Sequence, residues 1–194
     1  MRSDLAKSGP SRSVSRSLLH AVGVDDYEID QPFVGVVNSF SEIVPGHVHL
    51  RTIAEAVKAG IREAGGTPFE FNTIAGCDGI AQGHIGMRYI LPTREVIADS
   101  VELMAEAHRF DGLVFIPNCD KIVPGMLMGC ARVNIPSVFV SGGPMLSGRM
   151  PDDVDTELDG SMLLVGLVEL AVGRLSEVRM AAMERCVNPG CGSC

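Results

Sequence analysis

Residues 113–121 read LVFIPNCDK, and this stretch places a thiol, a carboxylate and an amine directly after an apolar run. Residues 113–116 have the length and the residue types of a buried strand. Cys119 offers a thiolate, a soft ligand suited to iron–sulfur clusters or zinc, whereas the neighbouring Asp120 offers the oxygen that Mg²⁺ prefers. With Lys121 next in the chain, the stretch predicts a strand that leads into a pocket for two different metals.

A second stretch repeats this design. Cys77 and Asp78 follow the β-rich residues 69–74 in the same way. An aspartate before a glycine is common in turns, and a lysine beside Asp120 can form a simple surface ion pair, so neither observation is specific alone. Because each of two separate strands is followed by a Cys-Asp pair, we interpret Asp78, Asp120 and Lys121 as the candidate residues of a divalent-cation site.

Strand-like and helix-like segments alternate along most of the chain, which is the pattern of α/β proteins. Helical segments separate short runs rich in β-branched and aromatic residues. We therefore predict a three-layer α/β/α domain with a parallel sheet. The strands are expected at residues 33–37, 69–74, 113–116 and 137–140, and the helices over residues 50–61, from Pro92 onward, and from about Pro124 to Asn134.

The C-terminal quarter of the chain has a different composition. Residues 147–159 are rich in Gly, Pro and acidic residues and are expected to form an exposed loop. The apolar residues that follow predict one long helix over about residues 161–184.

Polar and glycine-rich residues follow each expected strand. In open parallel sheets, ligands bind beyond the carboxyl ends of the strands, so these loops are expected to form one site. His84 lies in a glycine-rich loop after the Cys77-Asp78 pair and is a candidate pocket residue. Ser141, Gly142 and Gly143 can offer backbone N–H groups to an anionic ligand, although a plain turn explains them about as well.

Two further histidines, His47 and His49, are two residues apart. Side chains at this spacing point to opposite faces of a strand and do not form a helical chelating pair. We expect at least one of them to have a structural role, while the other can contact a substrate.

Three cysteines lie at the C-terminal end of the sequence, at positions 186, 191 and 194. Cys191 and Cys194 form a C-x-x-C pair, a spacing shared by zinc ribbons, redox-active pairs and cluster ligands. The second pair that a zinc ribbon requires is missing, and a thioredoxin-like pair opens a helix instead of following one. Metal ligation together with the distant Cys119 is the better interpretation.

The composition excludes several classes of protein. The chain has 194 residues, of which 46% are hydrophobic, and a net charge of −8, with only 16 Lys and Arg residues. Nucleic-acid binding depends on clustered positive charge, so a nucleic-acid partner is not expected. No apolar stretch reaches the roughly 20 residues that span a bilayer, and we expect no membrane segment. The first residues do not read as a secretory signal, which favours a cytoplasmic protein with reduced thiols.

Taken together, the motifs resemble the dihydroxy-acid and phosphogluconate dehydratase family of iron–sulfur dehydratases. The resemblance covers essentially the whole chain. It is closest to the dihydroxy-acid branch, which serves valine, leucine and isoleucine synthesis. The motifs that carry it are NSF at residues 38–40, PGHVHL at 45–50, EFNTIA at 70–75, CDGIA at 77–81, LPTREVIADS at 91–100, PNCDK at 117–121, and SGGP at 141–144 through CGSC at 191–194.

The resemblance implies specific roles. Cys119 and Cys194 would hold an iron–sulfur cluster, while Asp78, Asp120 and Lys121, the last with or without conversion to a carbamate, would hold Mg²⁺. The substrate would be a 2,3-dihydroxy carboxylic acid, such as 2,3-dihydroxyisovalerate or 2,3-dihydroxy-3-methylvalerate, which loses water to give a 2-keto acid. The family also implies a homodimer.

Two departures from the family pattern stand out. Some members have a third cluster cysteine where this chain has Gly46, so a 4Fe-4S cluster is expected here rather than a 2Fe-2S cluster. Family members are also several hundred residues long. We therefore expect residues 1–194 to be part of the N-terminal α/β domain, without the C-terminal β-rich domain and without the serine that removes the C2 proton. On this basis the chain alone is expected to be inactive.

Three alternatives stay open at this point. The same scaffold can act on a sugar acid of the phosphogluconate type. Cys191 and Cys194 can instead cycle as a dithiol in a non-catalytic metal or redox module. Finally, the cysteines can be inert in a doubly wound binding domain that holds no metal.

Overall fold

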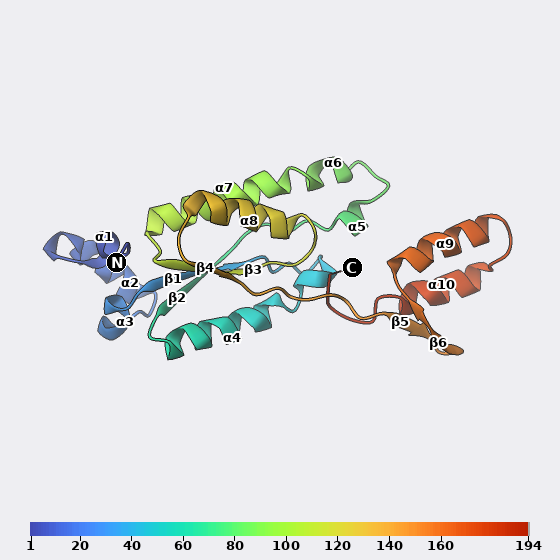
Figure 1. The fold of residues 1–194 in the computed structure, drawn as a ribbon, viewed down its shortest axis with the longest axis horizontal. Helices are drawn as coiled ribbons and strands as arrows, with labels where there is room; N and C mark the ends of the chain where they lie inside the picture. The colour runs from blue at the N-terminus through green and yellow to red at the C-terminus, as the bar shows by residue number, and fades with distance from the viewer. Residues whose placement is uncertain (194) are drawn as a thin grey trace.

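The computed structural model describes residues 1–193 and has at its centre a four-stranded parallel sheet (Figure 1). The strand order is β2-β1-β3-β4, so the first strand in the chain lies inside the sheet. The expected strands are present, with ends shifted by at most two residues. They are β1 (Phe33–Asn38), β2 (Thr67–Asn72), β3 (Gly112–Ile116) and β4 (Ser137–Phe139).

Helices cover both faces of this sheet (Figure 1). On one face α4 (Leu50–Glu63) buries Leu50 and Ala54 against Val36 and Ile116. On the other face α7 (Thr93–His108) and α8 (Ile122–Val133) bury a larger apolar cluster around Phe115. The predicted three-layer α/β/α architecture is confirmed.

The helix ends follow local sequence chemistry. Pro92 precedes the first residue of α7, where its missing N–H costs no hydrogen bond. Asn134 ends α8 in the left-handed conformation, with φ of 52°, which asparagine tolerates better than most residues. The predicted third helix therefore ends where expected, although it begins two residues earlier than Pro124.

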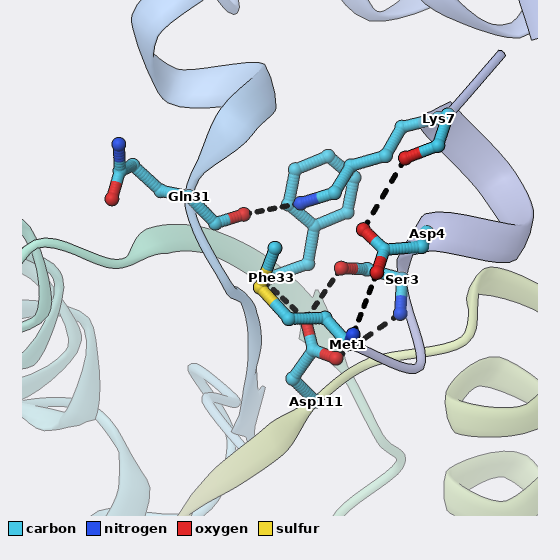
Figure 2. A network of polar contacts seen from close by, with 8 residues as sticks. Met1, Ser3, Asp4, Lys7, Gln31, Phe33 and Asp111 are labelled. Carbon is cyan, nitrogen blue, oxygen red and sulfur yellow. Dashed lines mark hydrogen bonds and ion pairs between the residues drawn. The ribbon is translucent and has the colours of Figure 1, made fainter.

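The N-terminal segment folds back onto the sheet through Asp111 (Figure 2). This carboxylate accepts hydrogen bonds from the backbone N–H of Ser3 at 3.1 Å and of Phe33 at 2.9 Å, and from the Ser3 hydroxyl. Lys7 is buried, with its ammonium 4.2 Å from the centre of the Phe33 ring and donating to the Gln31 carbonyl. The segment contains α1 (Asp4–Lys7), η1 (Pro10–Arg12), α2 (Ser13–Ala21) and α3 (Asp26–Asp30).

The C-terminal quarter differs from the prediction in two respects. The expected exposed loop at residues 147–159 contains a hairpin, β5 (Gly148–Met150) and β6 (Asp153–Leu158), because Met150 and Leu158 are buried against Val187. The prediction of one long helix over about residues 161–184 is also wrong. The segment forms two helices, α9 (Gly160–Ala171) and α10 (Glu177–Cys186). They are separated at Gly173, which has a φ of 74°, and a right-handed helix cannot continue through a residue in that conformation.

Three short helical turns complete the structure and lie in the loops beyond the strands. They are η2 (Pro45–His47), α5 (Asp78–Ala81) and α6 (Met87–Ile90). Within residues 1–193, no helix combines the length and apolar character needed to cross a bilayer.

Candidate metal centre

The carboxyl ends of the strands lie level with one another and bring the predicted site loops together. Asn38, the last residue of β1, pairs with Asn72 of β2 and with Ile116 of β3. The loops after these strands therefore leave the sheet at the same edge. A glycine-rich loop after β4 joins them, since the Gly142 N–H donates to the Pro117 carbonyl at 3.2 Å.

Cys119 occupies a tight turn between β3 and α8. Its φ is 60°, a left-handed conformation that costs roughly 1–2 kcal/mol for a residue other than glycine. Strained backbone of this kind persists only where the surrounding contacts enforce it, and it is concentrated at functional sites. The turn leaves Cys119 half-buried next to the loop that contains Gly46.

The chain segment of the C-terminal cysteines lies against this turn. A Cβ atom placed on Gly46 would lie 3.0 Å from the Cys119 Sγ and 2.8 Å from the Gly192 carbonyl oxygen. Ser193 donates its N–H to the Gly143 carbonyl at 3.0 Å and accepts from the Met145 N–H at 2.9 Å. Residues that are more than 70 positions apart in the sequence thus lie side by side, as metal ligation through distant cysteines requires.

The remaining cysteines are placed less decisively. Cys194, the second predicted cluster residue, lies outside the described residues. Cys191 is exposed, and Cys130 packs at the edge of the main apolar cluster, as expected for a structural thiol.

Asp78, Asp120 and Lys121 form one group. The Lys121 ammonium lies 3.1 Å from an Asp78 carboxylate oxygen and also donates to Asp120. The hydrogen bonds that Lys121 donates to Asp120 and, to a lesser extent, to Asp78 raise the pKa of Lys121. Burial alone would raise the pKa of Asp78, but the contacts with Lys121 outweigh it and the pKa of that carboxyl is lowered. The carboxylates of Asp78 and Asp120 therefore both contact the same ammonium group.

This arrangement fits part of a Mg²⁺ site. The ammonium lies between the two carboxylates, where a divalent cation would neutralise the same charges. Within the described part of the chain, no group of three or more His, Cys, Asp or Glu residues is close enough to hold a metal. A Mg²⁺ ion at this position would need further oxygen ligands from water, from substrate, from a modified Lys121 or from another part of the protein.

The predicted pocket residues have their polar groups in local contacts. His84 is exposed, with one ring nitrogen 3.0 Å from the Ile80 carbonyl and the other accepting from the Gly86 N–H. The Gly143 N–H donates to the Ser141 hydroxyl at 3.2 Å, and the Gly142 N–H is already bonded to Pro117. A substrate role for these residues stays a prediction.

Two residues of the site were not identified from the sequence as important. Asn118 and His47 are buried between the loops and hydrogen-bond backbone groups of their neighbours. Asn118 was visible only as part of the PNCDK motif, and one histidine of the 47–49 pair was expected to be structural. The contacts that give them significance are long-range, so no local pattern contains them.

The comparison with known protein families gives the class of protein. Residues 31–194 match the family described as Dihydroxy-acid/6-phosphogluconate dehydratase N-terminal. The match covers well over half of the chain, and the chain therefore belongs to this family.

Similar individual proteins are named more specifically. The chain is 56% identical to a protein named dihydroxy-acid dehydratase from Moorella thermoacetica, 58% to one from Caldicellulosiruptor saccharolyticus and 57% to one from Pyrococcus furiosus. Each match covers 100% of this chain but 35% of the relative. The chain thus spans about a third of the length of these curated relatives.

Proposed function

We propose that this chain is the N-terminal part of a dihydroxy-acid dehydratase, which converts 2,3-dihydroxyisovalerate and 2,3-dihydroxy-3-methylvalerate to 2-keto acids in branched-chain amino-acid synthesis. The observation that carries the proposal is the identity of 56–58% over the entire chain to proteins named dihydroxy-acid dehydratase. A cytoplasmic location belongs to the same proposal, because an iron–sulfur site needs reduced cysteines. A homodimer is proposed from the family resemblance alone.

In this proposal Cys119 and Cys194 are the cluster ligands of the chain. The proposal is supported by the approach of residues 192–193 to Gly46 and by the strained turn at Cys119. Because position 46 lacks a thiol, we propose a 4Fe-4S cluster. When bound, the cluster supplies a Lewis-acidic iron for the departing 3-hydroxyl.

Asp78, Asp120 and Lys121 are the proposed Mg²⁺ residues. The two carboxylates provide hard oxygen ligands, and Mg²⁺ keeps positions open for the carboxylate and 2-hydroxyl of a substrate. Conversion of Lys121 to a carbamate would replace its ammonium with an anionic oxygen donor. Only a neutral amine reacts with CO₂, so the raised pKa of Lys121 opposes this conversion until another cation neutralises both aspartates.

The proposed activity is tested with two proteins: the longer enzyme, meaning the proposed full-length dehydratase that contains residues 1–194, and this chain alone. Purified under argon with iron, sulfide and Mg²⁺ supplied, the longer enzyme should form 2-keto acid from 2,3-dihydroxyisovalerate faster than from 6-phosphogluconate. Residues 1–194 alone should show no turnover, since the proton-removing serine is proposed to lie elsewhere. Formation of 2-keto acid by the isolated chain would contradict this division of the site, and a preference for 6-phosphogluconate would instead support the sugar-acid branch.

A further inference from the structure

Asn118 lies at the centre of the loops that surround Cys119. The residue is 3% exposed, and its side-chain amide nitrogen donates to the Gly46 carbonyl at 2.8 Å and to the Gly143 carbonyl at 3.0 Å. The Gly143 carbonyl also accepts from the Ser193 N–H at 3.0 Å. One amide group thus joins the loop after β1, the turn of Cys119 and the loop after β4, and through Gly143 it reaches the segment of the C-terminal cysteines.

His47 fixes the same turn from the other side. The imidazole is fully buried, with Nε2 3.0 Å from the Asn118 carbonyl and Nδ1 2.6 Å from the Ser39 carbonyl. The Ser39 hydroxyl in turn donates to the carbonyl of Ile116, the last residue of β3, at 2.9 Å. The ring thus lies between the carbonyls of Ser39 and Asn118: a neutral imidazole donates its one N–H to one of them, and a protonated ring donates to both. The side chain of Asn118 holds the neighbouring loops.

We propose that Asn118 and His47 are positioning residues, which hold Cys119 beside Gly192 and Ser193 before any metal is bound. A left-handed cysteine is unfavourable by itself, so the turn needs contacts that select it. Buried amide and imidazole groups supply such contacts, since leaving their carbonyl partners unpaired is costly. A role of this arrangement in cluster binding rests on the proposed function, whereas the role of Asn118 and His47 in holding the two segments together does not.

The test replaces Asn118 with aspartate, which has the same shape but presents carboxylate oxygens to two carbonyl oxygens. The cluster-free chain, in a Cys191→Ser background, is treated with a short bifunctional maleimide, and cross-linked peptides are identified by mass spectrometry. We expect a Cys119–Cys194 cross-link in the parent and a loss of at least about tenfold in its yield in Asn118→Asp. Iron bound after anaerobic reconstitution should fall by a similar factor.

A matched control separates positioning from general destabilisation. Thr67 is also a buried polar residue, whose hydroxyl donates to the Glu28 carbonyl at 2.6 Å, but it lies at the amino end of β2, the end remote from the site. Thr67→Val should lower the thermal midpoint without changing the cross-link. Folding of each variant is checked by circular dichroism at the temperature of the cross-linking reaction. His47→Phe, which keeps the ring volume, should behave like Asn118→Asp.

The outcomes distinguish this inference from the proposed function. A cross-link that is lost in Asn118→Asp while the parent binds no iron supports the positioning role and counts against the cluster. If the parent and the folded Asn118→Asp variant bind equal amounts of iron and give equal yields of the cross-link, the cluster is supported and the positioning role is overturned. Absence of the cross-link in the folded parent also overturns it.

Discussion

At the scale of single residues, Gly192 is the position where a side chain is least tolerated in the candidate site. A Cβ atom there would lie 2.3 Å from both the backbone nitrogen and the Cα of Met145. These are backbone atoms, which cannot rotate away as a side chain can. The strand-like pairing between Pro144 and Ser193 therefore depends on a glycine at position 192.

We predict that Gly192→Ala separates the C-terminal cysteine segment from Cys119. Iron binding after reconstitution should fall by about tenfold or more, because relieving such overlap costs roughly 1–3 kcal/mol. Gly190→Ala is the matched control, since a Cβ at that position meets nothing within 4 Å. Equal iron content in the two variants would show that the pairing seen here is not needed for the site.

The residue types of the site were predictable from the sequence, but the hydrogen bonds that hold these residues in place were not. Cys119, Asp120 and Lys121 are adjacent in the sequence and follow an obvious strand, so their shared location needed no long-range information. The role of Asn118 depends on carbonyl groups 72 and 25 positions away, at Gly46 and Gly143. Every residue has a backbone carbonyl, so the residue type at the accepting position does not reveal such a hydrogen bond.

At the scale of elements, the N-terminal segment depends on the Asp111 carboxylate (Figure 2). Burial alone would raise the pKa of Asp111, but the hydrogen bonds from Ser3 and from the Phe33 N–H outweigh it, and the pKa lies below its ordinary value. A carboxyl with a lowered pKa in the folded state contributes stability above its ordinary pKa of about 3.9. That stability is lost as the pH falls through the lowered value.

We predict that Asp111→Asn lowers the free energy of unfolding at pH 7 by about 1–3 kcal/mol, since an amide presents N–H groups to the same donors. The difference from the unsubstituted chain should shrink as the pH falls below about 4. Urea unfolding at a series of pH values measures both effects. Asp155→Asn, at an exposed position of β6, should change neither. A difference that stays constant down to acidic pH would contradict the role given to the Asp111 charge.

The elements of the α/β layer were predicted better than those of the C-terminal quarter. Strands β1 to β4 and helices α4, α7 and α8 bury regular apolar patterns in one core, and pattern alone locates such elements. Strand β6 has the sequence DVDTEL, and most of its residues are exposed. Its pairing with β5 depends on Met150 and Leu158 packing against Val187, which no local pattern shows.

At the scale of the whole molecule, the hairpin β5–β6 and the helices α9 and α10 lie beyond the end of the sheet (Figure 1). Helix α9 is apolar around much of its circumference, and several of its large side chains are at least half exposed. They are Leu164, Val165, Leu167 and Val168. A helix with this composition is typical of one that is buried in a larger protein. This agrees with a chain that spans 35% of the length of its relatives.

The fold class follows from periodicity and could be predicted for the whole molecule, whereas the completeness of the site could not. Spacing places four loops at one edge of the sheet. In the structure the loops after β1, β3 and β4 lie around residues 192–193, and the loop after β2 joins them through the contact of Asp78 with Lys121. The full set of ligands in the proposed metal site would include groups from other parts of the protein, from substrate or from a modified lysine. Within residues 1–193 there are two carboxylates beside Lys121 and one cysteine beside Gly46.

The proposed cluster site is tested by anaerobic reconstitution of residues 1–194 with iron and sulfide, followed by electron paramagnetic resonance of the dithionite-reduced protein. The unsubstituted chain should show the signal of a reduced 4Fe-4S cluster. Cys119→Ala should lose this signal, while Cys130→Ala, which removes a thiol from α8 away from the site loops, should keep it. A cluster that persists in Cys119→Ala, or a folded chain that binds none, would contradict the assignment of Cys119 as the cluster ligand that this chain supplies.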